Sequence, residues 1–277
     1  MNRIGLAVMA VGLVGLVAPD VQANRCLVQD DSAGRSLQPG GSGGGETSGT
    51  RLWVARYRLL PAGSVLIENI QGDIDIEGWD RAEVQVAVIK KAAGPEANPD
   101  DVHIDVESRD QRLVLRTVYP GQSAESVRVD YRLRVPRQVR LERLRTVDGS
   151  IKVKQIEGSV DARTLNGNIE QLEVSGSVVA RAINGNIAVS LRALPEPPAP
   201  VDLDTVNGHL LLSLPPQANA DLQLSTVAGR VDSRYTFTVS DVPGDTTWRT
   251  RLGRGGTAVR LRTIRGDIRV TENEELL

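Results

Sequence analysis

The chain has 277 residues, and its 33 Lys and Arg against 35 Asp and Glu leave a formal net charge of −2. This balance excludes attraction of the whole chain to a nucleic acid, because affinity for phosphates needs an excess of cations. A single Cys excludes an internal disulfide framework, and His103 and His209 are too few for a clustered zinc site. We therefore expect no metal, no cofactor and no nucleic-acid partner.

The first 23 residues have the pattern of a secretory signal peptide. Arg3 precedes an uncharged apolar run, Ile4 to Ala18, and Val21-Gln22-Ala23 places small residues before a cleavage site. The apolar run is shorter than the roughly 20 residues that cross a membrane. The sequence predicts cleavage between Ala23 and Asn24, no membrane span after cleavage, and an extracytoplasmic location that is either periplasmic or secreted.

Residues 24–50 are predicted to be a disordered tether. Gly, Ser and short polar residues dominate this stretch, which cannot bury enough apolar area to offset its ordering entropy. Cys26 raises the alternative of a lipidated N-terminus, but a bulky Arg precedes it where a lipidation signal needs a small residue. Residues 51–277 are predicted to form one domain, with a β-rich part at 51–140 followed by repeats at 141–270.

A short phrase centred on a Gly recurs along that domain. Clear copies, such as TVDGSI and TLNGNI, alternate with weaker copies, such as QIEGSV. The five glycines from Gly149 to Gly185 are evenly spaced, and one clear copy plus one weak copy would form a single longer repeat. The repeat glycines, predicted to be structural turn residues, are Gly72, Gly149, Gly158, Gly167, Gly176, Gly185, Gly208, Gly229 and Gly266.

The phrase predicts short strands that stack on one another. Apolar residues stand two, four and seven positions after the Gly, and the spacing of two predicts that Ile151 and Val153 point inward. The Gly marks either a turn at positive φ or a close approach to a neighbouring backbone. The fold class is therefore predicted to be all-β, a β-solenoid or β-roll. A sandwich of hairpins is the alternative, because Asn-Gly also favours hairpin turns.

Extended strands are predicted to lead into the phrase where the spacing is uneven. The apolar pairs that indicate these strands are Val65 and Ile67, Val201 and Leu203, Leu222 and Leu224, and Val259 and Leu261. Three further strand-like stretches precede the repeats, at Val84 to Ile89, Val102 to Leu115 and Val127 to Val135. A Pro-rich segment at 194–200 is expected to be a stiff surface loop.

The order of these motifs resembles the bacterial putative adhesin family of β-strand-repeat domains, a family of unknown function. The resemblance rests on LPAGSVLIENIQGDIDIEGWDRAEVQV, then DYRLRVP at 130–136, then RTVDGSIKV, and it covers roughly residues 55–270. It implies a β-solenoid or β-roll in envelope and secreted proteins. The family has no established catalytic residues, so the resemblance implies none here. The segment at 194–200 departs from the even repeat and puts the continuity of the stack in question.

A row of carboxylates is one candidate site. Alternation with isoleucines places Asp73, Asp75 and Glu77 on one outward face. Clustered carboxylates on a β-helix would suit a polysaccharide lyase or hydrolase, but glycoside hydrolysis needs two carboxyls with separated pKa values around a sugar. A solvated face is the simpler interpretation. Trp79 beside the row is either a sugar platform or a Trp packed under the adjoining turn.

Arginines concentrate near the C-terminal end of the chain. Alternation predicts that Arg260, Arg262 and Arg269 face outward as a basic stripe, either for an anionic glycan or cell-wall polymer or as a solvated edge that discourages strand pairing. The glycines at 253–256 lack the Lys and Ser or Thr of a phosphate-binding loop. Apolar residues two positions after the repeat Gly argue against a calcium-binding β-roll. His209 is expected to be an exposed turn residue.

These patterns favour a secreted or periplasmic, non-enzymatic protein with an adhesin-like, structural or interaction role at the bacterial cell envelope. Its expected partners are an envelope glycan, an anionic cell-wall polymer or another envelope protein, and its oligomeric state is left open. The alternatives are a polysaccharide-active enzyme on a β-helix scaffold and an accessory protein of envelope signalling. A paired-carboxylate cleft with aromatic walls would favour the enzyme, whereas a flat ladder of Asn, Thr and Ser would favour adhesion or scaffolding.

Overall fold

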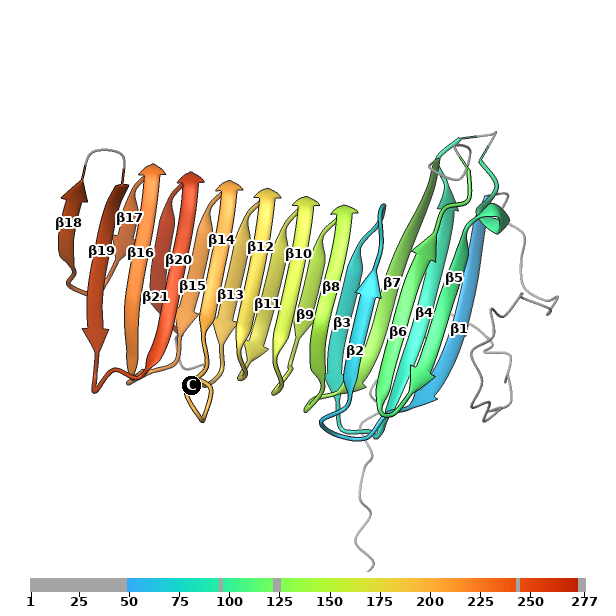
Figure 1. Ribbon diagram of the computed structural model, residues 1–277, viewed down its shortest axis with the longest axis horizontal. Coiled ribbons are helices and arrows are strands. Elements are labelled where there is room, and N and C mark those ends of the chain that lie inside the picture. The colour runs from blue at the N-terminus through green and yellow to red at the C-terminus, as the bar shows by residue number, and fades with distance from the viewer. Residues whose placement is uncertain (1–48, 95–96, 122–125, 243–244, 274–277) are drawn as a thin grey trace, which may run out of the picture.

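The computed structural model describes residues 49–94, 97–121, 126–242 and 245–273. The predicted signal peptide, Cys26 and nearly all of the predicted tether lie outside the described residues. Within them the chain is all-β, apart from a single 3₁₀ turn at Pro99–Asp101 (η1), and it forms two large mixed sheets. Figure 1 shows the strands of both sheets standing side by side along the long axis of the molecule.

Ten strands form the first sheet, sheet A, and eleven form the second, sheet B. The order in sheet A is β1 (Thr50–Arg58), β4 (Glu83–Ala92), β7 (Val127–Pro136), β3 (Ile74–Trp79), β9 (Ile151–Lys154), β11 (Ile169–Val174), β13 (Ile187–Leu191), β15 (Leu210–Leu214), β21 (Ile268–Glu272) and β17 (Val231–Ser233). The order in sheet B is β18 (Thr238–Val242), β19 (Asp245–Leu252), β16 (Ala220–Ala228), β20 (Thr257–Arg265), β14 (Val201–Asn207), β12 (Val178–Asn184), β10 (Val160–Asn166), β8 (Arg140–Asp148), β2 (Ser64–Glu68), β6 (Arg112–Val118) and β5 (His103–Arg109).

Consecutive strands alternate between the two sheets from β8 to β15, and we call each such pair, one strand in each sheet, a rung. Neighbouring rungs pair in parallel, so that Ile169 of β11 lies opposite Ile151 of β9 on one side and Ile187 of β13 on the other. Side chains that stack on adjacent rungs are 18 residues apart in the sequence. Hairpins would give antiparallel neighbours, so a sandwich of hairpins is not the arrangement of residues 140–214.

The Pro-rich segment lengthens one rung without interrupting the stack. Val201 of β14 lies opposite Val178 of β12, and Leu210 of β15 lies opposite Ile187 of β13. Stacked side chains are 23 residues apart across this segment instead of 18. The additional residues lie in the connection between β13 and β14, where Pro cannot disturb the ladder of backbone hydrogen bonds.

The order of the rungs in space departs from the order in the chain at both ends of the stack. The β20–β21 rung lies between β14–β15 and β16–β17, and the β2–β3 rung lies between β6–β7 and β8–β9. Antiparallel strands extend the sheets beyond these outer rungs. At one end β4 and β1 continue sheet A and β5 continues sheet B, while at the other end β19 and β18 continue sheet B.

The strand-like stretches of the N-terminal part are found with one difference. Val84 to Ile89 lies within β4, and Val127 to Val135 lies within β7. Val102 to Leu115, expected as one stretch, is two antiparallel strands, β5 and β6. The chain reverses at Asp110 and Gln111, which both have positive φ.

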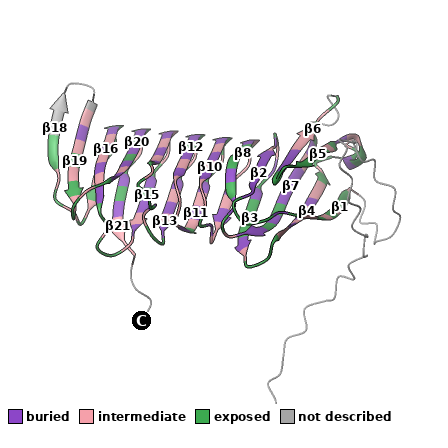
Figure 2. Ribbon diagram, turned by 60° about the horizontal axis from the view of Figure 1, so that its bottom comes forward, coloured by how far each residue is buried: buried purple, intermediate pink, exposed green. Residues whose placement is uncertain are grey.

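One apolar core runs between the sheets. Ile151 and Val153 are buried as predicted, and Figure 2 shows the same alternation of buried and less buried positions along strand after strand. The apolar pairs that lead into the phrase are buried as well. Gln171 is an exception, because it lies fully buried between Val153 and Val189, and its side-chain oxygen and nitrogen have no hydrogen-bond partner.

Apolar residues seven positions after a Gly do not all point inward. Ile156 and Val174 are buried, but Leu165 and Ile183 are 39% and 44% exposed. Thr164 immediately precedes Leu165 and faces the core, so strand alternation turns Leu165 to the outer face of sheet B. The sequence pattern did not separate these two kinds of position.

Close stacking explains the repeat glycines more generally than positive φ does. Of these glycines, Gly72, Gly167 and Gly266 have φ of +128°, +148° and +150°, and the other six do not adopt the left-handed region. A methyl group on Gly167 would overlap the carbonyl oxygen of Gly149, and one on Gly185 would overlap that of Gly167. The turns of successive rungs therefore approach too closely for any side chain.

Candidate functional site

The turns that carry the clear copies line one edge of the stack, and the residue after each Gly forms a continuous ladder there. We call these residues the post-glycine ladder, and in spatial order they are Asp73, Ser150, Asn168, Asn186, His209, Asp267 and Arg230. Each backbone N–H donates to the side chain of the preceding member, with distances of 2.8 to 3.2 Å. The acceptor is an oxygen except at His209, whose Nδ1 accepts from Asp267.

A second ladder runs beside the first, one residue before each Gly. Asn166 Nδ2 donates to Asp148 Oδ1 at 2.6 Å, and Asn184 Nδ2 donates to Asn166 Oδ1 at 2.9 Å. Asn207 Nδ2 continues the series to Asn184 Oδ1 at 2.9 Å. We call these four residues the pre-glycine ladder. All their side chains lie at the surface, so the edge presents a row of like polar groups instead of a converging cluster.

Threonine hydroxyls on the core side of the same turns donate hydrogen bonds to the glycine carbonyl oxygens. Thr164 Oγ1 donates to the carbonyl oxygen of Gly149 at 2.9 Å, and Thr205 makes the corresponding bond to Gly185 at 3.0 Å. Thr146, Thr226 and Thr263 repeat this contact on other rungs. Ala182 occupies the equivalent position between Thr164 and Thr205, and it has no hydroxyl to donate.

An aliphatic column follows the outer face of sheet B beside the pre-glycine ladder. Its members stand two residues before each clear-copy Gly and, in spatial order, they are Ile70, Val147, Leu165, Ile183, Val206, Ile264 and Val227. Five of them are among the exposed large hydrophobic residues, and Val147 and Val206 are half-buried. Sequence reasoning did not single out this column, although its signal, an aliphatic residue in every clear copy, is visible in the sequence.

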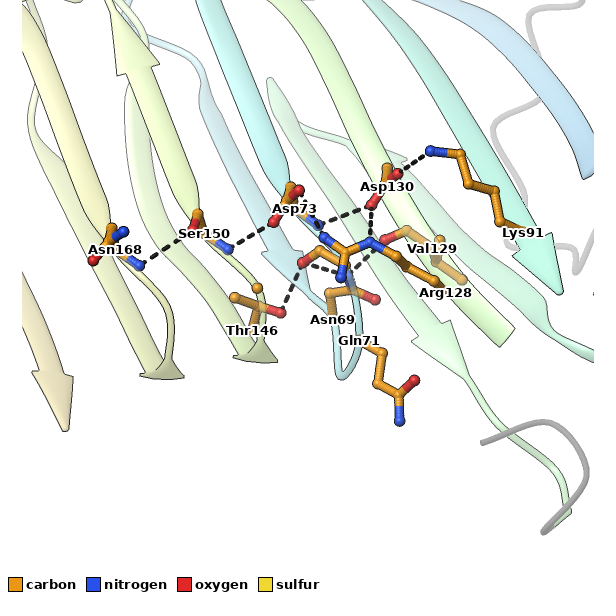
Figure 3. A network of polar contacts seen from close by, with 12 residues as sticks. Asn69, Gln71, Asp73, Lys91, Arg128, Val129, Asp130, Thr146, Ser150 and Asn168 are labelled. Atoms are coloured by element: carbon orange, nitrogen blue, oxygen red, sulfur yellow. Dashed lines mark hydrogen bonds and ion pairs between the residues drawn. The ribbon is translucent and has the colours of Figure 1, made fainter. Parts of the chain in front are cut away.

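The start of the post-glycine ladder is joined to β7 by a network of charges, shown in Figure 3. Asp130 Oδ1 accepts from the backbone N–H of Asp73 at 3.1 Å, so Asp130 takes the place of one more ladder member. Lys91 Nζ lies 2.8 Å from Asp130 Oδ2, and Arg128 bridges Asp130 at 2.9 Å and Asp73 at 2.6 Å. Burial acts to raise the pKa of Asp130, but the hydrogen bonds from Lys91 and Asp73 and the charge of Arg128 outweigh it and lower the pKa.

The predicted carboxylate row begins at Asp73, immediately before β3, and continues along the outer face of β3 with Asp75 and Glu77; all three are exposed. Asp73 pairs with Arg128 at 2.6 Å, and Glu77 lies 3.5 Å from Arg134. Asp75 lies between Arg132 and Lys152 of the neighbouring strands. The row is thus flanked by cationic side chains along its length, as on an ordinary charged sheet face.

The predicted basic stripe is wrong as a single surface. Arg260 and Arg262 lie on β20 in sheet B, whereas Arg269 lies on β21 in sheet A. The turn at Gly266 passes the chain from one sheet to the other, so alternation alone could not place the three on one face. Each is also paired with a carboxylate: Arg260 with Asp202 at 3.6 Å, Arg262 with Asp204 at 3.4 Å and Arg269 with Asp232 at 2.9 Å.

The remaining sequence candidates are placed as follows. His103 begins β5 and is exposed, and His209 is exposed but also belongs to the post-glycine ladder. The backbone N–H of Gly256, in the glycine segment at 253–256, donates to Asp221 Oδ2 at 3.1 Å. Among the described residues, no three His, Cys, Asp or Glu side chains are grouped as metal ligands. No helix in the described part of the chain is long and apolar enough to span a membrane.

Trp79 borders an open cleft where four connections meet, with a volume of about 400 Å³. The indole N–H donates to the carbonyl of Glu83 at 2.8 Å, which fixes the ring. Arg81 lies 4.9 Å from the ring centroid, and the cleft is also lined by Asp80 and Glu157. Trp79 is therefore fixed by a hydrogen bond to the start of β4 and at the same time borders the cleft, whose lining combines charged side chains with Pro61, Ala82 and Pro136.

No family model matches the sequence, and no curated protein matches it. Solved structures with a similar course of the chain include a putative cell adhesion protein from Clostridium sporogenes, with 13% identity, a TM-score of 0.46 and coverage of 80% of this chain and 100% of that one. Putative adhesins from Bacteroides fragilis and Parabacteroides distasonis have 12% and 14% identity, TM-scores of 0.30 and 0.24, and coverage of 80% of this chain and 97% of theirs. At this level of similarity neither a family nor a function follows for this chain.

Proposed function

We propose that this chain is an exported, non-enzymatic β-solenoid with an adhesin-like or scaffolding role at the bacterial cell envelope. The observation that carries the proposal is the pair of ladders along the turn edge. In the pre-glycine ladder, Asn side chains recur from rung to rung and form hydrogen bonds to their counterparts, and in the post-glycine ladder each backbone N–H donates to a polar side chain of the preceding rung. Such a surface is extended and periodic, whereas catalysis needs different groups brought together at one point.

An envelope glycan is the partner class that suits this edge best. An extended polymer of repeating hydroxyl and amide groups can form similar hydrogen bonds at each rung. Asn166 and Asn184 each donate one ladder bond and accept another, which leaves each amide one N–H and one acceptor site for a ligand. Most members of the pre-glycine ladder are neutral, so the proposed contact depends on hydrogen bonds more than on net charge.

Glycan binding by the purified exported protein tests this proposal. We expect retention on extended envelope glycans that falls about tenfold or more in the double variant Asn184→Ala/Asn207→Ala. The matched control, Gln85→Ala/Gln223→Ala, removes two amides from the sheet faces and should leave binding unchanged. Equal binding by both variants would place the contact elsewhere. The Trp79 cleft is then the next surface to test, with Trp79→Ala.

Enzyme activity on the same scaffold is tested separately. We expect no release of sugar from acidic polysaccharides by the wild-type protein, because Asp73 and Glu77 are paired with arginines. Release that disappears in the triple variant Asp73→Asn/Asp75→Asn/Glu77→Gln would instead establish a lyase or hydrolase.

Export is tested by N-terminal sequencing of the extracytoplasmic protein, which should begin at Asn24. An N-terminus at a lipidated Cys26 would contradict this.

A further inference from the structure

Three arginines stack on one another in the middle of sheet B. Arg145 of β8 lies opposite Arg163 of β10, and Arg163 lies opposite Arg181 of β12, on strands that stand side by side in Figure 1. We call these residues the arginine row. In the parallel registers of the described strands, every other pair of opposed charged residues combines a cation with a carboxylate, as Arg260 does with Asp202. The arginine row is the exception to this charge pattern.

Like charges that lie opposite one another destabilise a sheet. Neighbouring rungs are about 4.8 Å apart, which is shorter than the roughly 8 Å screening length of physiological salt, so salt does not remove the repulsion. Carboxylates of the protein remove only part of it. Arg163 is paired with Asp161 at 2.8 Å, but within the described residues no carboxylate lies at ion-pair distance from Arg145 or Arg181.

A carboxylate borders the row at each end, and each of these carboxylates is engaged by another arginine. Glu68 on β2 is paired with Arg116 at 3.1 Å, and Asp204 on β14 is paired with Arg262 at 3.4 Å. The row therefore keeps cationic groups for an anionic ligand, and these groups are confined to three rungs.

Two further rows run beside the arginine row on the same three rungs. Their members are Val147, Leu165 and Ile183 of the aliphatic column, and Asp148, Asn166 and Asn184 of the pre-glycine ladder. The three rungs thus present cations, an apolar strip and hydrogen-bonding groups in parallel lines. An acidic sugar has the matching groups: a carboxylate, which a guanidinium can bind with two hydrogen bonds, a face of C–H groups, and hydroxyls.

We infer that the arginine row binds the carboxylates of an acidic polysaccharide, which lies along the stack across β8, β10 and β12. The inference rests on the proposed function and deepens it, because the amides of Asn166 and Asn184 form their hydrogen bonds to the same polymer. A neutral glycan leaves the repulsion in the arginine row uncompensated. Asp148 is the one carboxylate in the three rows, so it opposes binding of the polymer.

Isothermal titration calorimetry of the exported protein with polygalacturonate and with alginate, which carry a carboxylate on every sugar, tests the inference. We expect binding to at least one of them, with a dissociation constant that rises about tenfold or more in Arg145→Gln/Arg181→Gln. The matched control, Arg260→Gln/Arg262→Gln, removes two cations of the same sheet that are already paired with carboxylates, and it should leave the affinity nearly unchanged. Asp148→Asn should tighten binding.

Thermal unfolding separates binding from a structural role. Arg145→Gln/Arg181→Gln relieves repulsion between like charges, so it should keep or raise the midpoint of unfolding. A clearly lower midpoint would show that the row stabilises the fold and would contradict the argument from repulsion.

Methyl-esterified polygalacturonate, an uncharged form of the same polymer, distinguishes this inference from the proposed function. Suppose that both forms bind and that binding falls in Asn184→Ala/Asn207→Ala but not in Arg145→Gln/Arg181→Gln. The glycan contact would then stand, and the arginine row would be overturned as its carboxylate site. Equal losses in the two arginine variants, or no binding of either acidic polymer, would also overturn it. Flotation with phosphatidylglycerol vesicles that requires Arg145 and Arg181, without binding of the polymers, would assign the row to lipid instead.

Discussion

At the scale of single residues, backbone contacts between successive turns decide which side chains each repeat position accepts. Glycine is required where one turn touches the next, and threonine is favoured where its hydroxyl reaches a glycine carbonyl. Both requirements come from the neighbouring rung, and at Gly72, Gly167 and Gly266 the positive φ of the turn itself adds to the requirement for glycine. Substitutions at these positions should therefore change the free energy of unfolding in opposite directions: a side chain added at a stacked glycine should lower it, and a hydroxyl added at a threonine position should raise it.

Gly167→Val should lower the free energy of unfolding by more than about 2 kcal/mol, because a β-branched residue is strained at φ +148° and its side chain would displace the backbone of Gly149. Gly94→Val is the control, since nothing lies within 4 Å of the methyl group that it would add. Denaturant unfolding of both variants measures the difference. Equal losses of stability would contradict the stacking argument.

Gln171→Met should stabilise the protein by about 1 to 3 kcal/mol, because it removes a buried amide whose polar atoms have no partner and nearly keeps the side-chain volume. The same substitution at the half-buried Gln223 should have little effect. Thermal unfolding measures both. A lower midpoint for Gln171→Met would show that the amide is satisfied in solution.

Ala182→Thr should add the hydroxyl that this rung lacks, since Thr164 and Thr205 on either side donate to the glycine carbonyls below them. One such hydrogen bond is worth about 0.5 to 1.5 kcal/mol. Ala182→Val has nearly the same shape without the hydroxyl and is the control. A gain for Thr but not for Val in the free energy of unfolding supports the assignment, and equal changes would exclude it.

At the scale of elements, the junction between β7 and β3 joins the N-terminal part to the repeats. Asp130 extends the post-glycine ladder by one position, and its charge is balanced by Lys91 and Arg128. No sequence motif marked this junction, because DYRLRVP is not a copy of the repeated phrase. Only the pairing of β7 with β3 brings Asp130 beside Asp73.

This junction should make stability depend on pH. The pKa of Asp130 is lowered in the folded state, so its contribution is present above its unfolded pKa of about 3.9 and is lost as pH falls through the lower folded value. Thermal unfolding of Asp130→Asn should therefore show a deficit at pH 7 that shrinks in acid below about pH 4. Asp232→Asn, which removes an exposed partner of Arg269, should show little deficit at either pH. A deficit independent of pH would argue against a charge effect.

At the scale of the whole molecule, the periodicity of the sequence predicted the strands but not their order in space. The even spacing of the glycines predicted short strands, their inward residues and a longer repeat, and the pairing offset of 18 residues agrees with a unit of two copies. The swapped positions of β16–β17 and β20–β21 could not be predicted, because similar copies of the phrase can pair with one another in any order. Arg262 and Arg269 were wrongly predicted to share one face, because strand alternation shows which side chains point outward but not which sheet a strand joins.

The central claim, that the stack is built from interchangeable rungs of 18 residues, is tested most directly by removing one rung. Deletion of residues 167–184 joins Asn166 to Gly185 and restores the phrase TLNGNI, so β10 can pair with β14 and β13 with β9. We predict that this variant folds and unfolds cooperatively, with the strand signal of the parent in circular dichroism. Deletion of residues 167–175, half a unit, sends the following strand to the wrong sheet and should abolish cooperative unfolding. Equal behaviour of the two deletions, or loss of folding in the first, would contradict the account.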